Sequence, residues 1–415
     1  MTETALPDPA HVAAPETLPH ARSGYFPMLD SVRAVAAFGV LALHASARTG
    51  SFGTGAAAKF FSHGDVGVPI FFVLSGLLLY RPLARAHLGD AARAERAAGT
   101  RSFYERRFLR ILPLYWFVLL FVTVVFHNVD MSSPALVARH GLLLDTYSSA
   151  WVRSGQWMQQ TWSLTTEVAF YLLLPVVALG VGLIVRRVRA PRRIHAEVAT
   201  CGVIALVSFG VAWWLAATRP NGTVASVWLP AQGYLFALGM ILAVISVADH
   251  TTLHGALHRV AQPTWLWWAV GAGAYLVVVF GLDLPDNAFT TPETVTQQLL
   301  VRALYAVVAL CLIVPAAFGG TRGLGRRVLS SAWLRWLGII SYGIFLWHLD
   351  WIKQLQDFGL YTYPSRGRVF PFVLISTVFL AVGSAALTYY LIERPLQRRA
   401  HASGATPAPT PATTP

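Results

Sequence analysis

The stretch RAVAAFGVLALHASA, residues 33–47, indicates what kind of protein this is. It is almost continuously apolar, yet it begins with Arg33 and carries His44 in its second half. An apolar stretch of this kind is typical of a membrane-spanning helix, and charged or titratable side chains are costly inside a bilayer. These two side chains therefore call for a functional explanation.

The composition of the whole chain supports a membrane protein. The chain has 415 residues, of which 55% are hydrophobic and 12% are charged, and its mean hydropathy is +0.54. Soluble domains carry about a quarter charged residues. The two cysteines, Cys201 and Cys311, fall inside apolar runs, so we predict neither a disulfide framework nor a metal site.

We predict an all-α polytopic membrane protein with about ten transmembrane helices, because about ten stretches are long and apolar enough to span a bilayer. The expected spans are residues 29–48, 64–81, 109–127, 162–185, 198–217, 226–248, 264–281, 296–317, 334–351 and 370–392. They form one membrane domain over residues 25–395. We expect a disordered cytoplasmic leader over residues 1–24 and a disordered tail, rich in Pro, Thr and Ala, over residues 396–415.

The basic residues predict the orientation. Arginines are dense between the second and third spans and in the run RRVRAPRR at residues 186–193, whereas DLPDNAFTTPE at residues 283–293 has no Lys or Arg. Because Lys and Arg accumulate on the cytoplasmic side, both termini are expected in the cytoplasm and the protein in the inner (plasma) membrane. The net charge of +13 then fits acidic lipid headgroups and does not call for a nucleic acid.

The first span carries a polar stripe. Arg33 and His44 are eleven residues apart, which returns to nearly the same helix face roughly 16 Å further along. Asp30 lies one turn before Arg33 on that face. Ionisable residues within a membrane usually face the bundle interior and mark a site or pathway. The alternative is an arginine that reaches the interface and a histidine bonded to a neighbouring helix.

Two other spans carry titratable groups at a similar depth. Glu167 lies near the outer end of the fourth span, and His348 lies past the midpoint of the ninth. By counting helical rise, these two residues and His44 lie roughly 8 Å to the outer side of the midplane. We therefore expect the three to share one cavity.

The third span begins with a basic cluster. The stretch RRFLRILPLYW starts at Arg106 and places Arg107 and Arg110 three residues apart, on one helix face. Guanidinium groups gathered at a membrane surface suit phosphate groups. The alternative is ordinary anchoring of a cytoplasmic helix end. Ser75 in the second span lacks the motif of a nucleophilic serine, and we expect it to serve helix packing.

Six segments in this order resemble the acyltransferase-3 family of membrane-bound bacterial O-acyltransferases, in a stand-alone form without the hydrolase-like domain that some relatives carry. They are LDSVRAVAAFGVLALH, GVPIFFVLSGLLL, RRFLRILPLYW, WSLTTEVAFYLLLP, ISYGIFLWH and YYLIERPL. The resemblance implies transfer of an acyl group, usually acetyl, from acyl-CoA to a hydroxyl. It implies that His44 is catalytic, that Arg33 is its partner arginine, and that Arg107 and Arg110 contact acyl-CoA.

We expect a mechanism in which cytoplasmic acyl-CoA is a co-substrate and no cofactor stays bound. His44 acts as general base or carries the acyl group itself, and Glu167 orients it. Three residues are expected to line the acceptor side: Trp162, Tyr342 and His348. The acceptor is expected to be a sugar-containing molecule, such as an envelope glycan or a glycolipid, although a cytoplasmic acceptor and the oligomeric state stay open.

Two other functions fit parts of this pattern. A proton-coupled transporter or exporter of a small polar molecule or glycolipid would also bury Arg, Glu and His in a bundle of spans. Against it, the sequence shows no internal repeat and no paired broken helices. A structural subunit of an envelope assembly would not need a titratable His44.

Overall fold

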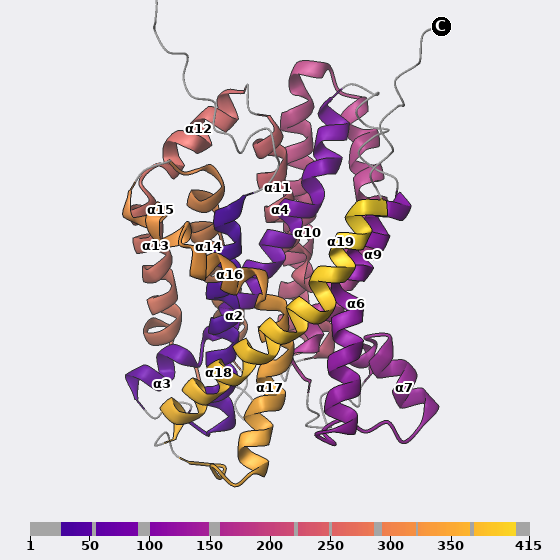
Figure 1. The fold of residues 1–415 in the computed structure, drawn as a ribbon. Coiled ribbons are helices and arrows are strands. Elements are labelled where there is room, and N and C mark those ends of the chain that lie inside the picture. Colours follow the sequence, from indigo (N-terminus) through magenta and orange to yellow (C-terminus); the bar gives the residue numbers. More distant parts are fainter. Residues whose placement is uncertain are drawn as a thin grey trace, which may run out of the picture.

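The computed structural model describes residues 26–51, 55–89, 100–148, 158–219, 223–248, 251–285, 293–320, 323–365 and 369–403. Within these ranges every regular element is a helix, which confirms the predicted all-α class (Figure 1). The predicted leader, residues 1–24, lies outside the described residues.

Long helices form the body of the molecule. They are α2 (Pro27–Arg48), α4 (Gly67–Leu88), α6 (Thr100–Val124), α9 (Thr161–Arg186), α10 (Arg193–Thr218), α11 (Leu229–Val247), α13 (Thr264–Leu276), α14 (Val295–Phe318), α17 (Ser341–Asp357) and α18 (Phe370–Thr388). Shorter helices connect and extend them: α3 (Ala56–Phe61), α7 (Pro134–Gly141), α12 (Thr252–Ala261), α15 (Leu324–Leu329), α16 (Ala332–Ile339) and α19 (Arg394–Ser403). Single helical turns lie at η1 (Gly64–Val66), η2 (Asp145–Tyr147), η3 (Ala190–Arg192), η4 (Val224–Val227), η5 (Val277–Gly281) and η6 (Tyr389–Glu393).

Nine helical segments of the described chain are long and apolar enough to cross a membrane. They match nine of the ten predicted spans: Pro27–Arg48, Ala56–Leu88, Phe103–Val124, Thr161–Arg186, Ala190–Thr218, Val224–Val247, Thr264–Gly281, Val295–Phe318 and Phe370–Arg399. The last of these includes α19, which runs to Ser403 and so continues as a helix into the segment 396–415 that was expected to be disordered.

The remaining predicted span, residues 334–351, is not one helix. It is divided at Ile340 into α16 and α17, and neither part reaches the length of the other spans. The sequence around the break, Gly338 to Ser341, contains glycine, two β-branched residues and serine, all of which are weaker helix formers than alanine or leucine. At Gly338 the chain lies directly against the backbone oxygen of Asp30 in α2, where a Cβ would overlap with that oxygen. Close packing on α2 therefore accompanies the break.

Helix α2 lies inside the bundle. It packs against α4, α14, α16, α17 and α18, and it runs through the middle of the ribbon in indigo (Figure 1). Two thirds of its membrane window is buried by protein, 67%, against 22% for the segment Ala190–Thr218 at the periphery. Because neighbours surround α2, its polar stripe faces protein and not lipid.

Glycines let α4 and α11 approach closely. A Cβ on Gly76 would overlap with the backbone oxygen of Phe236, and one on Gly239 would overlap with that of Val73. Small residues at helix crossings favour association in membranes because the backbones can come into contact. This contact fixes the wall of α4 that carries Ser75.

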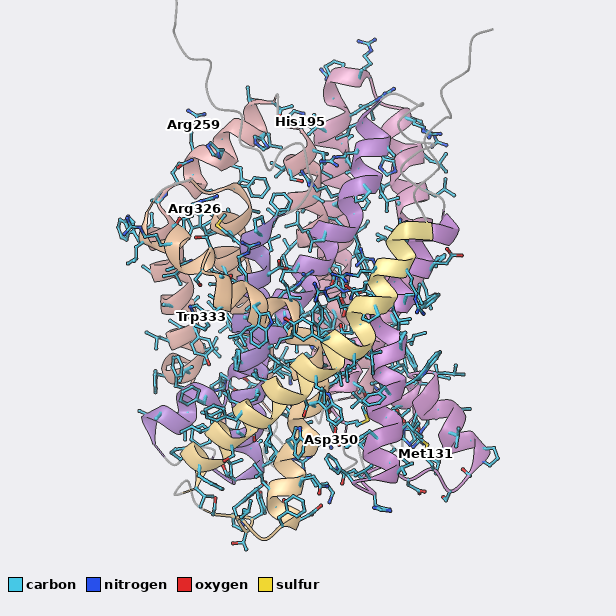
Figure 2. The ribbon with its side chains drawn as sticks, viewed as in Figure 1. Met131, His195, Arg259, Arg326, Trp333 and Asp350 are labelled. Carbon is cyan, nitrogen blue, oxygen red and sulfur yellow. The ribbon has the colours of Figure 1, made fainter. Side chains whose placement is uncertain are left out.

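The two ends of the bundle differ. Arg259 and Arg326 lie toward one end, and Met131 and Asp350 lie toward the other (Figure 2). This separation agrees with the basic loops being on one side, and which side faces the cytoplasm stays a prediction.

Candidate active site

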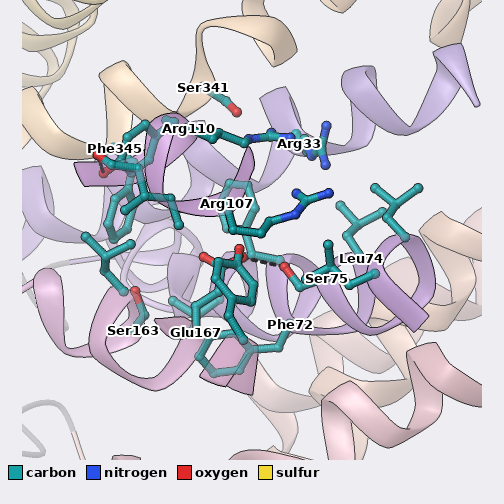
Figure 3. Close-up of a pocket in the computed structure, with 18 residues that line it drawn as sticks. Arg33, Phe72, Leu74, Ser75, Arg107, Arg110, Ser163, Glu167, Ser341 and Phe345 are labelled. Carbon is teal, nitrogen blue, oxygen red and sulfur yellow. Dashed lines mark hydrogen bonds between the residues drawn. The ribbon is translucent and has the colours of Figure 1, made fainter. Parts of the chain in front are cut away.

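Helices α2, α4, α6, α9 and α17 enclose a pocket in the middle of the bundle (Figure 3). Its empty volume is about 790 Å³, including the open space at its mouth. The pocket is lined by Arg33, Val68, Phe71, Phe72, Leu74, Ser75, Leu78, Leu79, Arg107, Arg110, Ile111, Ser163, Leu164, Glu167, Tyr171, Ser341, Tyr342 and Phe345.

Three arginines give the pocket its charge. Arg33 comes from α2, and Arg107 and Arg110 come from successive turns of α6 (Figure 3). The Nη1 atom of Arg33 donates to Oδ1 of Asp30 at 3.0 Å. By contrast, Arg107 and Arg110 make no hydrogen bond or ion pair with any residue in the described ranges. Two such guanidinium groups in a membrane-embedded pocket fit an anionic ligand.

Glu167 belongs to the same pocket. Its Oε1 atom accepts hydrogen bonds from the hydroxyls of Ser75 and Tyr171 (Figure 3). The charge of Glu167 also acts on Arg33 and Arg107. Among the described residues both of its hydrogen bonds go to Oε1, which leaves Oε2 for a ligand.

His44 has a different partner from the one that we expected. Its Nδ1 atom lies 3.0 Å from Nε2 of His348 and 2.9 Å from the carbonyl oxygen of Val40. The two imidazole rings are 5.0 Å apart between centroids. The structure thus brings His44 and His348 together, and it places Glu167 against Ser75 and Tyr171 and not against His44.

The separation of Glu167 from His44 has a geometric cause. Depth was counted from the ends of the predicted spans, as if all helices began at the same level. The span of His348 is broken at Ile340, and α9 packs its first turns against α4 so that Glu167 meets Ser75. Glu167 consequently lies with the arginines and not with the histidines.

The histidine pair lies just beyond the pocket. Neither His44 nor His348 lines it, but Phe345 does, and the rings of Phe345 and His348 are 5.8 Å apart. The pocket extends along α4 from Leu79 to Val68, which is eleven residues or roughly 16 Å of helix. It therefore runs from the arginines toward the level where Phe345 separates it from the two imidazoles.

Of the three residues expected on the acceptor side, only Tyr342 lines the pocket. Its hydroxyl donates to the carbonyl oxygen of Ile111 at 3.0 Å. Trp162 does not line it, and packs edge-to-face against Phe72 at 6.2 Å between ring centroids. His348 pairs with His44 as described above.

Two residues that line the pocket, Tyr171 and Ser75, were not predicted to belong to the site. Tyr171 contributes a hydroxyl to Glu167, and the spacing of the two residues, four apart on α9, is a signal that could have identified it. Ser75 was set aside because no partner was evident for it.

Comparison with known proteins adds a family. The family model described as an acyltransferase domain matches residues 26–392. The chain is 26% identical over 399 residues to the putative peptidoglycan O-acetyltransferase YrhL of Bacillus subtilis (strain 168), which covers 90% of this chain and 55% of that protein.

Two further relatives are similar at the same level. One is the peptidoglycan O-acetyltransferase OatA of Listeria monocytogenes, 25% identical over 392 residues, with 90% of this chain and 56% of that protein covered. The other is the O-acetyltransferase OatA of Staphylococcus aureus (strain NCTC 8325), 24% identical over 397 residues, with 90% and 58% covered. The chain thus spans somewhat more than half the length of these relatives. No solved structure matches it.

Proposed function

Because this chain belongs to the acyltransferase-3 family, we propose that it is a membrane-bound O-acyltransferase, which moves an acetyl group from acetyl-CoA to a hydroxyl of a sugar-containing envelope acceptor. One observation carries the proposal: two arginines without a protein partner among the described residues face a pocket that runs toward the pair of His44 and His348. Two of the relatives are named as peptidoglycan O-acetyltransferases, which makes peptidoglycan the first acceptor to test.

Arg107 and Arg110 supply the donor site. Acetyl-CoA is made in the cytoplasm, and its phosphates can each take a forked, charge-assisted pair of hydrogen bonds from a guanidinium group. Arg33, held by Asp30, adds a third positive charge from α2. The arm between the diphosphate and the sulfur has about as many bonds as four residues of backbone, so it extends to roughly 14 Å. A donor bound at the arginines can therefore bring its thioester close to the level of His44.

His44 supplies the chemistry. An unprotonated nitrogen of its ring takes the proton of the acceptor hydroxyl while that oxygen bonds to the thioester carbonyl carbon. The carbon–sulfur bond then breaks, and the CoA thiolate takes the proton that His44 holds. In the other order, the unprotonated nitrogen of His44 bonds to the thioester carbonyl carbon and CoA leaves as the thiolate. The acetyl group then passes from this nitrogen to the hydroxyl oxygen, and the hydroxyl proton goes to the thiolate.

Glu167 has a role in the pocket and not beside His44. Its Oε2 atom can accept a hydrogen bond from an amide N–H of the donor's arm, while Ser75 and Tyr171 hold Oε1 in place. The carboxylate also offsets part of the positive charge of Arg33 and Arg107. Tyr342 lines the same passage.

The experiment follows labelled acetyl from acetyl-CoA into the envelope fraction of membranes that contain the protein. Arg107→Ala and Arg110→Ala should each raise the KM for acetyl-CoA about tenfold or more, because charge-assisted hydrogen bonds contribute about 1.5–3 kcal/mol. The control is Arg106→Ala, because Arg106 is an exposed neighbour on the same helix and does not line the pocket. Equal effects of all three substitutions would contradict a specific donor site.

The same assay tests His44. His44→Ala should abolish transfer while the protein still accumulates in the membrane, and His195→Ala, at an exposed position on α10, should not. Full transfer by His44→Ala would remove the histidine from the chemistry. Export of a molecule that continues without acetyl-CoA would instead favour a transporter.

A further inference from the structure

We propose that His348 is a positioning residue that holds His44 as the tautomer protonated on Nδ1, so that Nε2 of His44 is the atom that accepts the proton or the acyl group. The inference rests on the proposed function for its consequence, but the tautomer itself follows from hydrogen-bond geometry. It replaces the expected place of His348 on the acceptor side.

The first step concerns His348. Its Nδ1 atom lies 2.7 Å from the carbonyl oxygen of Phe345, one turn earlier in α17. A carbonyl oxygen can only accept a hydrogen bond, so Nδ1 of His348 carries the proton. The Nε2 atom of a neutral His348 is then an acceptor with a free lone pair.

The second step concerns His44. Its Nδ1 atom faces two groups, the carbonyl oxygen of Val40 at 2.9 Å and Nε2 of His348 at 3.0 Å. Both are acceptors, so a single proton on Nδ1 of His44 satisfies both in a shared hydrogen bond. A proton on Nε2 of His348 would instead leave the Nδ1 lone pair of His44 facing the lone pairs of the Val40 carbonyl. The pattern of two carbonyls and two rings is consistent with one tautomer of each histidine.

The third step concerns the free end of His44. Its Nε2 atom has no hydrogen-bond partner among the described residues, and this atom is not fully buried. It therefore reaches accessible space. His348, by contrast, has no exposed surface, and its helix packs against α2 and α18. The buried ring is a fixed anchor, and the partly exposed ring presents a basic nitrogen.

The pair also stabilises the charged state of His44. When Nε2 takes a proton, the Nδ1–H of the imidazolium donates a charge-assisted hydrogen bond to His348. A buried carboxylate does this for the histidine of a serine hydrolase triad, where it also fixes the tautomer. Here a neutral imidazole serves, and it adds no negative charge to the membrane interior.

Two substitutions test the positioning role through activity. In His348→Gln the side-chain oxygen can take the place of Nε2 and still accept from His44, whereas His348→Leu fills the space without an acceptor. We expect His348→Leu to lower kcat for acetyl transfer about 10- to 100-fold, a range known for groups that orient a reactive ligand, with the KM for acetyl-CoA within about twofold. His348→Gln should recover most of kcat. Equal losses in both variants, or no loss in His348→Leu, would overturn the proposal.

Nitrogen-15 NMR of the full-length protein in bilayers, with labelled histidine rings, tests the tautomer without any substrate. The signals that disappear in His44→Gln identify the ring of His44. We expect its Nδ1 to be protonated and its Nε2 to be unprotonated, and the opposite assignment would overturn the inference. This measurement also separates the two proposals, because absence of acetyl transfer in the natural protein would contradict the enzyme function and leave the tautomer result standing.

Discussion

The hydroxyl of Ser75 donates a hydrogen bond to Glu167 inside the pocket, so a serine and a carboxylate meet where acetyl-CoA is proposed to bind. If Ser75 only supports Glu167, as we propose, then Ser75→Ala should slow acetyl transfer about fivefold, since one buried hydrogen bond contributes about 1 kcal/mol. The rate of transfer from labelled acetyl-CoA measures this effect.

Ser163→Ala is the matched control for Ser75→Ala. Ser163 lines the same pocket, but its hydroxyl donates to the backbone oxygen of Gln160 and not to the carboxylate. We expect nearly unchanged transfer. Complete loss in Ser75→Ala, with normal amounts of protein in the membrane, would instead identify Ser75 as the residue that carries the acyl group.

Single side chains could be identified from the sequence better than their partners. Arg33, Arg107 and Arg110 were predicted to act together, and they line one pocket. Helical spacing and intramembrane charge are properties of one segment, so they can be read directly. The partners of Glu167 and His44 depend on how separate helices are displaced along their axes, and no pattern within one segment encodes that.

Among the helices, the packing of α16 against α2 depends on the absence of a side chain at Gly338. Gly338→Ala should lower the free energy of unfolding by about 1–3 kcal/mol, because the new methyl group would overlap with the rigid backbone of Asp30. Since Asp30 holds Arg33, the KM for acetyl-CoA should rise as well. A thermal unfolding curve in detergent measures the stability change.

Gly202→Ala provides the comparison. Gly202 lies in α10 with nothing within 4 Å of the position of an added Cβ. Alanine is the better helix former, so stability should be unchanged or rise by up to about 1 kcal/mol. Equal changes in stability for Gly338→Ala and Gly202→Ala would contradict this explanation, because of these two glycines only Gly338 lies against α2.

Hydrophobic length predicted nearly every long helix, and the exception is informative. The apolar stretch 334–351 reads as one continuous span because hydropathy counts residues without regard to helix continuity. The break at Ile340 depends on the approach of Gly338 to another helix, which is a tertiary contact. Weak helix formers made a break possible, and packing selected its position.

The orientation of the whole molecule in the membrane can be tested by labelling. Ser132 and Arg259 are both exposed, and Figure 2 shows Met131, the neighbour of Ser132 in the chain, and Arg259 near opposite ends of the bundle. With cytoplasmic termini, Ser132→Cys should react with a membrane-impermeant maleimide in intact cells, and Arg259→Cys should react only after permeabilisation.

The natural cysteines make the labelling clean. Cys201 and Cys311 are buried, so the unmodified chain should give little background and serves as the control. The reverse pattern, with Arg259→Cys labelled in intact cells, would place the arginine pocket's basic end outside. Cytoplasmic acetyl-CoA would then no longer be a reasonable donor.

The all-α class and the membrane domain could be predicted from the sequence, because composition and hydropathy are sums over the chain. The arrangement around α2 could not. Its apolar stretch reads like that of any span, yet other helices of the described chain surround it, among them α4, α14, α16, α17 and α18. A span surrounded by protein and a span surrounded by lipid have similar hydropathy. Only the polar stripe of α2 indicated that this helix lies inside the bundle.

Phe71, Phe72 and Phe345 line the pocket, and their aromatic rings affect whether ions can leak through it. A hydrated ion crosses a membrane only where oxygen or nitrogen atoms replace its water, and aromatic carbons offer none. A thin, largely apolar arm faces no such cost. An aromatic lining of this kind therefore opposes the leak of ions through the pocket, so a donor site of the proposed kind need not discharge the electrochemical gradient across the bilayer.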